Sequence, residues 1–143
     1  MEGWSPQQLE EWLNHRCGLF GVSGDSDDMR TLLASSEPAA ALAVGMFCYR
    51  AKKYVGAFLS ALGGADAVLI GGGIGEQAPT MRARILSGMA WAGIGIDDES
   101  NAAALQGDAR IDSQRGAVQV WVIAVDEAER IAQYAAQIVQ SLP

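Results

Sequence analysis

The feature that most constrains this chain is a glycine-rich segment directly after a short apolar run. Residues 65–70 read Ala-Asp-Ala-Val-Leu-Ile, which is typical of a buried strand, and residues 71–75 contain four glycines. Glycines after a buried strand let the backbone approach a ligand closely, with several N–H groups directed at it. A tight turn without a ligand is the alternative, although four glycines exceed what a turn requires. The segment predicts a binding loop before a helix at residues 79–91.

Strand and helix signals alternate along the second half of the chain. A second apolar run at residues 118–125 predicts another buried strand, and residues 94–96 are a candidate for a short one. Alternating strands and helices indicate an α/β domain with a partly parallel sheet. Apolar spacing and capping residues predict helices over residues 25–33, 36–62, 79–91, 99–105 and 126–142.

The opening part of the chain is expected to be almost entirely helical. Ser5 and Pro6 begin an amphipathic helix within residues 1–16. Residues 18–24 contain three glycines and predict a loop or a short extended piece. A complete doubly wound domain normally starts with strands, so this helical region predicts that strands from elsewhere are missing.

Charge and cysteine content exclude several classes of function. A net charge of −7 argues against a nucleic-acid or anionic-membrane surface, because both need a basic patch. The longest apolar stretch, residues 39–49, is shorter than the roughly 20 residues that cross a bilayer. Cys17 and Cys48 lack a metal-type spacing, and the first residues lack a signal-peptide pattern. We therefore expect a cytoplasmic protein with reduced thiols and neither a nucleic-acid nor a membrane partner.

One interpretation of the glycine segment is a dinucleotide-binding fingerprint. Gly73, Gly75 and Ala78 satisfy its spacing. Asp97 or Asp98 follows about 20 residues later, where an acid would bind a ribose hydroxyl. Such a fingerprint normally opens a domain on its first strand, whereas this one follows a long helix. A Rossmann-type NAD-binding unit therefore remains an alternative.

A second interpretation rests on four blocks of sequence that occur in a fixed order. The blocks read Gly-Leu-Phe-Gly-Val-Ser-Gly (18–24, followed by Asp-Met-Arg at 28–30), Phe-Cys-Tyr-Arg-Ala-Lys-Lys-Tyr-Val-Gly-Ala-Phe (47–58), Gly-Gly-Ile-Gly-Glu (72–76) and Ile-Ala-Val-Asp-Glu (123–127). Together they resemble the acetate kinase family, which comprises acetate and propionate kinases. The similarity covers residues 17–143, and it corresponds to about the last third of a family member.

The resemblance implies a fold and an activity. The family transfers the γ-phosphoryl group of ATP to a short carboxylic acid, giving an acyl phosphate and ADP, with Mg²⁺ as the metal. Its fold is that of the actin-like ATPases, a ribonuclease H-like architecture in which nucleotide lies between two domains. Residues 17–143 would then be a partial C-terminal nucleotide-binding domain, the back half of such a fold, with a mixed sheet, flanking helices and a helical N-terminal region.

The resemblance also implies roles for particular residues. Glu127 matches an acid associated with the magnesium ion; the structural alternative is a capping box of Asp126 and Glu129. The residues that match nucleotide-binding positions are Asp28, Met29, Arg30, Gly72, Gly73, Ile74, Gly75, Glu76 and Gln77. For Asp28 and Arg30 the alternative is a solvated first helical turn. Gln77 stands where the family usually has Asn.

The resemblance assigns no catalytic residue to this chain. Phosphoryl transfer needs cations around the moving group, a phosphate cradle and an acceptor site, which the family supplies from its earlier two-thirds. We expect the chain to bind ATP or ADP but to be inactive alone. The implied partners are the nucleotide and either a second copy, as a homodimer, or a chain that supplies the N-terminal domain. A non-catalytic interaction module is the third hypothesis.

Overall fold

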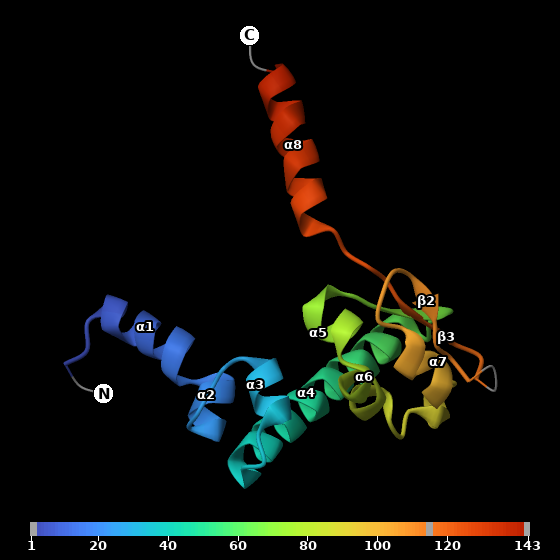
Figure 1. Cartoon of the computed structure of the whole chain (residues 1–143), viewed down its shortest axis with the longest axis horizontal. Helices are drawn as coiled ribbons and strands as arrows, with labels where there is room; N and C mark the ends of the chain where they lie inside the picture. The colour runs from blue at the N-terminus through green and yellow to red at the C-terminus, as the bar shows by residue number, and fades with distance from the viewer. Residues whose placement is uncertain (1–2, 114–115, 142–143) are drawn as a thin grey trace. The chain divides into compact units, whose positions relative to one another are not determined.

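The chain is organised as two compact units. The computed structural model describes residues 3–113 and 116–141. Its contacts divide the chain into Met1–Gly64 and Ala65–Pro143 (Figure 1). The first unit is helical and the second contains the sheet, which confirms the predicted α/β class with a helical N-terminal region. Within the two described ranges, no helix combines the length and apolar content needed to cross a bilayer.

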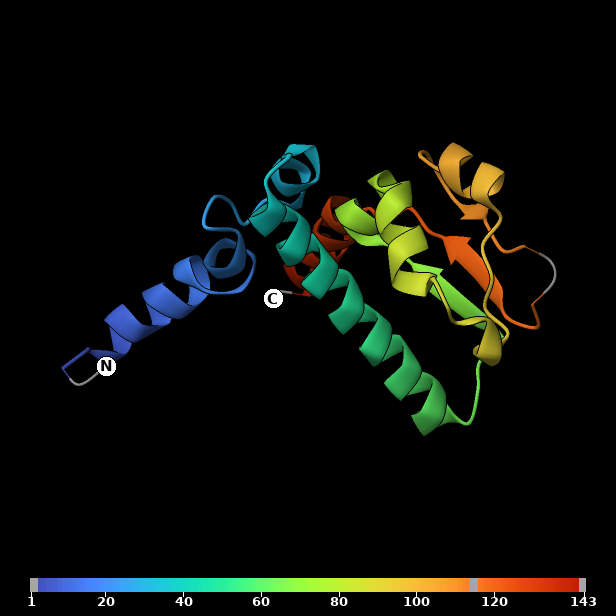
Figure 2. The ribbon, with the colours of Figure 1, turned by 90° about the horizontal axis from the view of Figure 1, so that it is seen from below.

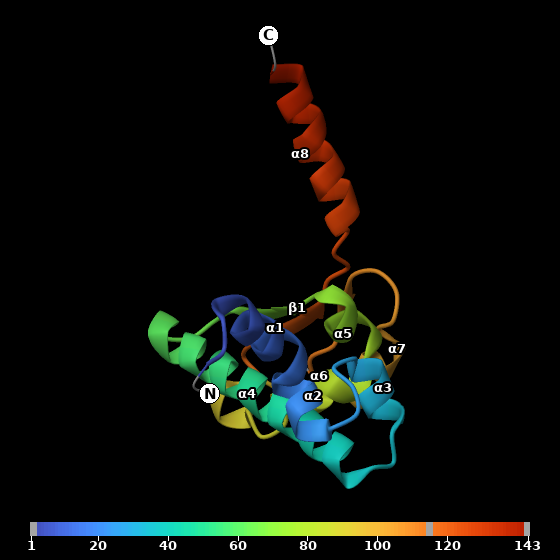
Figure 3. The ribbon, with the colours of Figure 1, turned by 90° about the vertical axis from the view of Figure 1, so that its left-hand side faces the viewer.

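In the first unit, two short helices pack against one long helix. Figure 3 shows α2 and α3 beside α4. The first helix begins as predicted, because Ser5 Oγ accepts a hydrogen bond from the Gln8 N–H and Gln8 Oε1 accepts one from the Ser5 N–H. The helices of this unit are α1 (Pro6–Arg16), α2 (Gly18–Ser23), α3 (Met29–Ala34) and α4 (Pro38–Leu62).

The prediction of a loop or short extended piece over residues 18–24 is wrong, because residues 18–23 form the helix α2 and Gly24 caps it. Two of the three glycines mark the ends of the helix rather than an irregular segment. Gly18 and Gly24 adopt φ angles of 64° and 69°, and the Gly24 N–H caps the helix by donating to the Phe20 carbonyl. Gly21 lies inside α2, where a Cβ atom would come within 2.9 Å of the Arg16 carbonyl oxygen.

The 25-residue helix α4 agrees with the prediction at both ends. Pro38 occupies the first turn, and Gly63 ends the helix in the left-handed conformation, donating its N–H to the Leu59 and Ser60 carbonyls. The buried residues of the helix are Ala40, Ala43, Val44, Cys48 and Leu59. Cys48 is therefore packed inside the protein, as expected of a small apolar side chain.

The second unit is built on a small mixed sheet. Its strands are β1 (Ala67–Ile70), β2 (Ala109–Arg110) and β3 (Gln119–Val122), in the order β1-β3-β2. The two apolar runs identified in the sequence, β1 and β3, pair in parallel and lie side by side in Figure 2. The antiparallel partner β2 was not predicted, because two residues carry no periodicity. The core of this unit contains Met81, Leu86, Met89, Ile94, Ile111, Val118, Val120 and Val122.

Helices of the second unit differ from the predictions around residues 86–96. The helix expected over residues 79–91 ends at Leu86, and Gly88 adopts a φ of 71°. Trp91 lies in a 3₁₀ turn and is 74% exposed. Residues 94–96 form no strand, and Ile96 only bridges Asp112. The helices are α5 (Gly72–Gln77), α6 (Pro79–Leu86), α7 (Asp98–Ala103) and α8 (Glu127–Ser141), with the 3₁₀ turn at Ala90–Ala92.

Candidate functional site

The glycine segment after β1 folds into a short helix rather than an open loop. Gly71 precedes α5 in an extended conformation, and Gly72 begins it with a φ of 76°. A Cβ atom on Gly71 would lie 2.8 Å from Val125 Cγ2, and one on Gly75 would lie 2.7 Å from Ile70 Cγ2. Three of the four glycines are therefore required by the fold itself, either for a positive φ or for close packing.

Gly73 differs from the other glycines of the segment. It has no positive φ, it is exposed, and a Cβ atom built on it would meet no atom within 4 Å. Inside a helix, glycine is less favourable than alanine by roughly 0.5–1 kcal/mol. Glycine at position 73 thus makes α5 less stable than alanine would, and no packing contact requires it. The next residue, Ile74, is 37% exposed.

The carboxylate of Glu76 joins the start of α5 to the segment that follows β3. Its Oε1 accepts hydrogen bonds from the Gly72 N–H (2.9 Å) and the Val125 N–H (3.1 Å). One of the predicted nucleotide-binding side chains is therefore engaged within the protein. Gln77, another of them, donates from Nε2 to the Leu105 carbonyl over 3.2 Å.

Arg82 belongs to this site, although the sequence alone did not single it out. The side chain is completely buried (0% exposed), and burial lowers its pKa. Its Nη1 donates to the carbonyls of Gly75 (2.7 Å) and Glu76 (2.9 Å), at the end of α5. Its Nη2 donates to the carbonyls of Asn101 (2.5 Å) and Ala104 (2.9 Å), and its Nε to Asn101 Oδ1 (2.7 Å). A lone arginine in an amphipathic helix gives no sequence signal of such burial.

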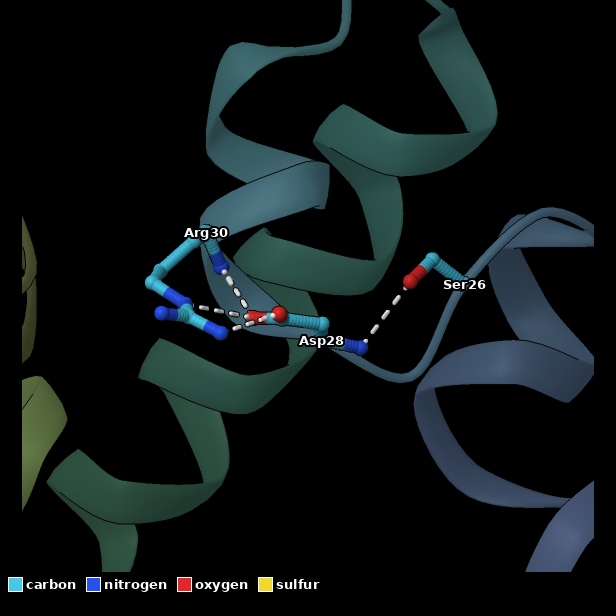
Figure 4. A network of polar contacts seen from close by, with 3 residues as sticks. All are labelled: Ser26, Asp28 and Arg30. Carbon is cyan, nitrogen blue, oxygen red and sulfur yellow. Dashed lines mark hydrogen bonds and ion pairs between the residues drawn. The ribbon is translucent and has the colours of Figure 1, made fainter.

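In the first unit, Asp28 and Arg30 form a local pair at the start of α3 (Figure 4). Asp28 Oδ1 accepts from the Arg30 N–H (2.9 Å), and its Oδ2 lies 2.8 Å from Arg30 Nη2. The hydrogen bonds from Arg30 lower the pKa of Asp28, and the same carboxylate raises the pKa of Arg30. Ser26 Oγ accepts from the Asp28 N–H, while Met29 is buried. The helix expected over residues 25–33 therefore begins only at Met29, with Asp28 as its cap.

Glu127, matched to a magnesium ligand, is the first residue of α8, and its side chain lies outside the described residues. Its neighbour Asp126 caps the helix, because Asp126 Oδ1 accepts from the Glu129 N–H over 2.8 Å. Within the described part of the chain, no group of three or more His, Cys, Asp or Glu side chains could hold a metal ion. Asp97, considered for a ribose contact, caps α7 by accepting from the Ser100 N–H (2.8 Å).

The first unit also contains a pocket of about 840 Å³ between α2 and α4. Its walls are mostly apolar and include Arg50, Lys53 and Tyr54. Among the described residues, neither Asp28 nor Arg30 lines it. The pocket could not be foreseen from the sequence, because the helix that forms one wall was predicted as a loop.

Comparison with known proteins matches the whole arrangement to one family. Residues 1–133 match the Acetokinase family. An acetate kinase from Solibacter usitatus is 47% identical over 135 residues, which cover 92% of this chain and 33% of that protein. The crystal structure of Porphyromonas gingivalis acetate kinase has a TM-score of 0.85 at 34% identity, covering 96% of this chain and 35% of that one. A propionate kinase from Francisella tularensis has a TM-score of 0.79 at 34% identity, covering 92% and 34%.

The likeness to these structures confirms the predicted fold class, that of a partial actin-like ATPase domain. The chain spans about a third of the length of the relatives it matches. The family match begins at residue 1, so it includes α1, which the four sequence blocks did not cover. Since sequence and structure agree over nearly the entire chain, the chain belongs to the acetokinase family.

Proposed function

We propose that this chain is the nucleotide-binding C-terminal part of a kinase that transfers the γ-phosphoryl group of ATP to a short carboxylic acid. The products would be an acyl phosphate and ADP. The chain's own contribution is to bind the adenosine part of the nucleotide with residues 72–77. Membership of the acetokinase family supports the reaction class. The glycine segment supports the binding role.

The observation that carries the proposal is the identity of residue 73. Packing or backbone conformation accounts for Gly71, Gly72 and Gly75, but not for Gly73. A ligand that lies directly on the backbone accounts for glycine at a helical position where a Cβ atom would otherwise be accommodated. The exposed side chain of Ile74 provides apolar surface beside it for an adenine ring.

The other predicted contacts are proposed with narrower roles. Met29 is buried, whereas the Arg30 side chain is 91% exposed even though it is paired with Asp28, so Arg30 is the group of that segment proposed to meet a ligand. Glu76 would shape α5, since its Oε1 is bonded to two backbone N–H groups. Glu127 remains the proposed magnesium-associated acid, but the described side chains do not build a metal site by themselves.

We propose that the chain alone is inactive. Phosphoryl transfer depends on positioned cations and a phosphate cradle, and the chain covers only about a third of its relatives. Purified chain incubated with ATP, Mg²⁺ and acetate or propionate should therefore form no acyl phosphate, measured as its hydroxamate. Accumulation of the hydroxamate above a boiled-protein blank would contradict this part of the proposal.

Nucleotide binding is tested by calorimetric titration of the folded chain with ADP in the presence of Mg²⁺, with NAD as the competing ligand. We expect saturable binding of ADP and none of NAD. Gly73→Val should weaken ADP binding by about 10-fold or more, because the new side chain occupies the ligand's place; 10-fold corresponds to about 1.4 kcal/mol.

The matched control is Gly56→Val. Gly56 also lies within a helix and has no positive φ, and a Cβ atom on it would meet no atom within 4 Å, so the chemical change is the same. This variant should bind ADP like the original chain. Binding of NAD but not ADP would favour the dinucleotide-binding alternative. No binding of either ligand to a folded chain would favour the interaction module.

Association with the remainder of such a kinase is the second part of the proposal. The apolar side of α8 is exposed, with Ile131 at 68%, Tyr134 at 58% and Val139 at 67%. Large apolar side chains in a row along one helix face mark an interaction surface. Because relatives are about three times as long as this chain, we propose that residues equivalent to their N-terminal two-thirds cover this face. A homodimer is the competing arrangement.

A further inference from the structure

We infer that Arg82 is a positioning residue for the nucleotide segment: its guanidinium group holds the carboxyl end of α5 so that Gly73 and Ile74 are presented to the ligand. The inference rests on the proposed function, because residues 72–77 must bind the nucleotide for their placement to matter. Arg82 itself is buried beneath the segment and would touch neither the nucleotide nor the transferred group.

The first step of the argument is the composition of the contacts around Arg82. All five of its hydrogen bonds go to neutral oxygens, four backbone carbonyls and one side-chain amide. Arg110, by contrast, is bonded to the carboxylate of Asp112 over 2.6 Å. A buried cation is costly unless its donors are satisfied, and an apolar side chain would fill the same space more favourably. An arginine at this position therefore indicates a requirement for its donors.

The second step concerns which carbonyls are bound. Those of Gly75 and Glu76 lie in the last turn of α5, and those of Asn101 and Ala104 lie at the end of α7. The last carbonyls of a helix lack partners within the helix and carry its negative dipole end. Each of these helices has only six residues, which is too short for an independent helix. One guanidinium group thus caps two helices that would not hold their shape alone.

The third step is that α5 is held at both ends. Arg82 binds the carbonyls at its end, while Glu76 Oε1 accepts from the Gly72 N–H at its start. The exposed residues between these two attachments are Gly73 and Ile74. A binding segment that is fixed in advance loses less conformational freedom when the ligand binds. The geometry therefore converts a short glycine-rich helix into a preorganised surface.

Arginine is specifically suited to this arrangement. Its planar group offers five N–H donors in a fixed fork, whereas lysine offers three donors at a single point. The Nη1 atom of Arg82 bonds to α5, and the Nη2 atom bonds to the end of α7. An ammonium group cannot span both helices from one position. Arg82→Lys should therefore fail to replace the arginine although it keeps the charge.

The test measures separately how firmly residues 72–77 are held and how tightly the chain binds ADP. Amide hydrogen exchange of the ligand-free chain should be faster at residues 72–77 in Arg82→Lys, with little change in β1 and β3. Calorimetry with Mg²⁺ and ADP should show affinity lower by about 10- to 100-fold, as is usual when a supporting residue is lost. Ile111→Ala, which removes a fully buried side chain of the same unit, is the stability control and should leave ADP affinity of the folded chain unchanged.

A rescue experiment tests whether the N–H donors of the guanidinium group are what residues 72–77 require. Arg82→Ala leaves a space lined by the five acceptor oxygens, so guanidinium ions well below denaturing concentration should restore part of the ADP affinity. Sodium chloride at equal ionic strength should not. If the arginine variants do not fold, Asn101→Ala removes one of the five bonds and is measured in the same way, with a smaller loss expected.

The outcomes distinguish the positioning role of Arg82 from the proposed binding of nucleotide by residues 72–77. Faster exchange at residues 72–77 with weaker ADP binding supports the inference. Faster exchange with unchanged ADP affinity overturns it and leaves the proposed function intact. If the original chain binds no ADP although it is folded, the proposed function fails, and the positioning role fails with it. Unchanged exchange in Arg82→Lys would also overturn the inference.

Discussion

The Nε atom of Arg82 donates to Oδ1 of Asn101 over 2.7 Å, and both side chains are buried. The same Asn101 amide donates from Nδ2 to the Pro79 carbonyl over 3.0 Å. The amide is thus fixed on both sides, and it sets the plane of the guanidinium group. Two residues 19 positions apart in the sequence join α6 and α7 around one buried charge.

Asn101→Leu should destabilise the second unit. The substitution leaves the buried Nε of Arg82 without its partner and removes the hydrogen bond to the Pro79 carbonyl, and an unsatisfied buried polar group costs about 1–3 kcal/mol. Urea denaturation followed by circular dichroism measures the free energy of unfolding. Ala102→Ser, at the adjacent exposed position, should change that free energy by less than about 0.5 kcal/mol. Equal stability of the two variants would mean that Asn101 does not support Arg82.

Alanine substitutions at Gly73 and Gly75, two of the three glycines in α5, should have opposite effects on stability. In Gly75→Ala the new methyl group would overlap Ile70 Cγ2, and overpacking of this kind costs about 1–3 kcal/mol. In Gly73→Ala the methyl group enters open space within a helix, which should raise stability by roughly 0.5–1 kcal/mol. The two free energies of unfolding are compared by urea denaturation. A loss of stability in Gly73→Ala would show that the fold requires this glycine.

The ion pair between Asp28 and Arg30 should give a pH-dependent contribution to stability. The side-chain hydrogen bond from Arg30 holds the folded-state pKa of Asp28 below its ordinary value of 3.8. A depressed folded-state pKa stabilises the fold above the ordinary value, and the contribution is lost as pH falls through the folded-state pKa. The stability difference between the original chain and Asp28→Asn should therefore shrink as pH falls below about 4.

Asparagine is a suitable replacement in this measurement because it also caps helices, so the loss of charge is isolated from the loss of the cap. Urea denaturation is repeated for both proteins at pH values above and below the ordinary pKa. High salt should reduce the difference, because the pair is exposed to solvent. A difference that is independent of pH would contradict a charged role for Asp28.

A charged side chain on the apolar face of α8 should block the proposed association with a polypeptide equivalent to the N-terminal two-thirds of a relative. Ile131→Glu places a carboxylate on the exposed apolar side, whereas Gln137→Glu introduces the same group at a position outside that stripe. Mixing each variant with a polypeptide equivalent to the N-terminal two-thirds of a relative, followed by size-exclusion chromatography, measures complex formation. Only Ile131→Glu should lose the complex. Loss of a self-associated form instead would favour the homodimer.

The local sequence was sufficient to predict an element where the residues at its two ends favour a start and a stop. The helix α4 lies between Pro38 and Gly63, and both positions could be identified because proline favours the first turn and glycine the left-handed cap. The parallel strands β1 and β3 were recognisable as short apolar runs bounded by glycine or polar residues. Family membership could be predicted for a similar reason, since four blocks in order identify a chain without any coordinates.

What the sequence could not determine depends on residues that are distant along the chain. The four glycines at residues 71, 72, 73 and 75 look equivalent in the sequence. In the structure, Gly71 packs against Val125, Gly75 packs against Ile70 and Gly72 has a positive φ, whereas none of these applies to Gly73. Arg82 is buried because α5 and α7 both end beside its guanidinium group. The sequence by itself therefore determined the major elements and the family, through local backbone preferences and ordered motifs. The tertiary structure decided which side chains brace the glycine segment and which face outward, because carbonyl groups from separate helices converge only after folding.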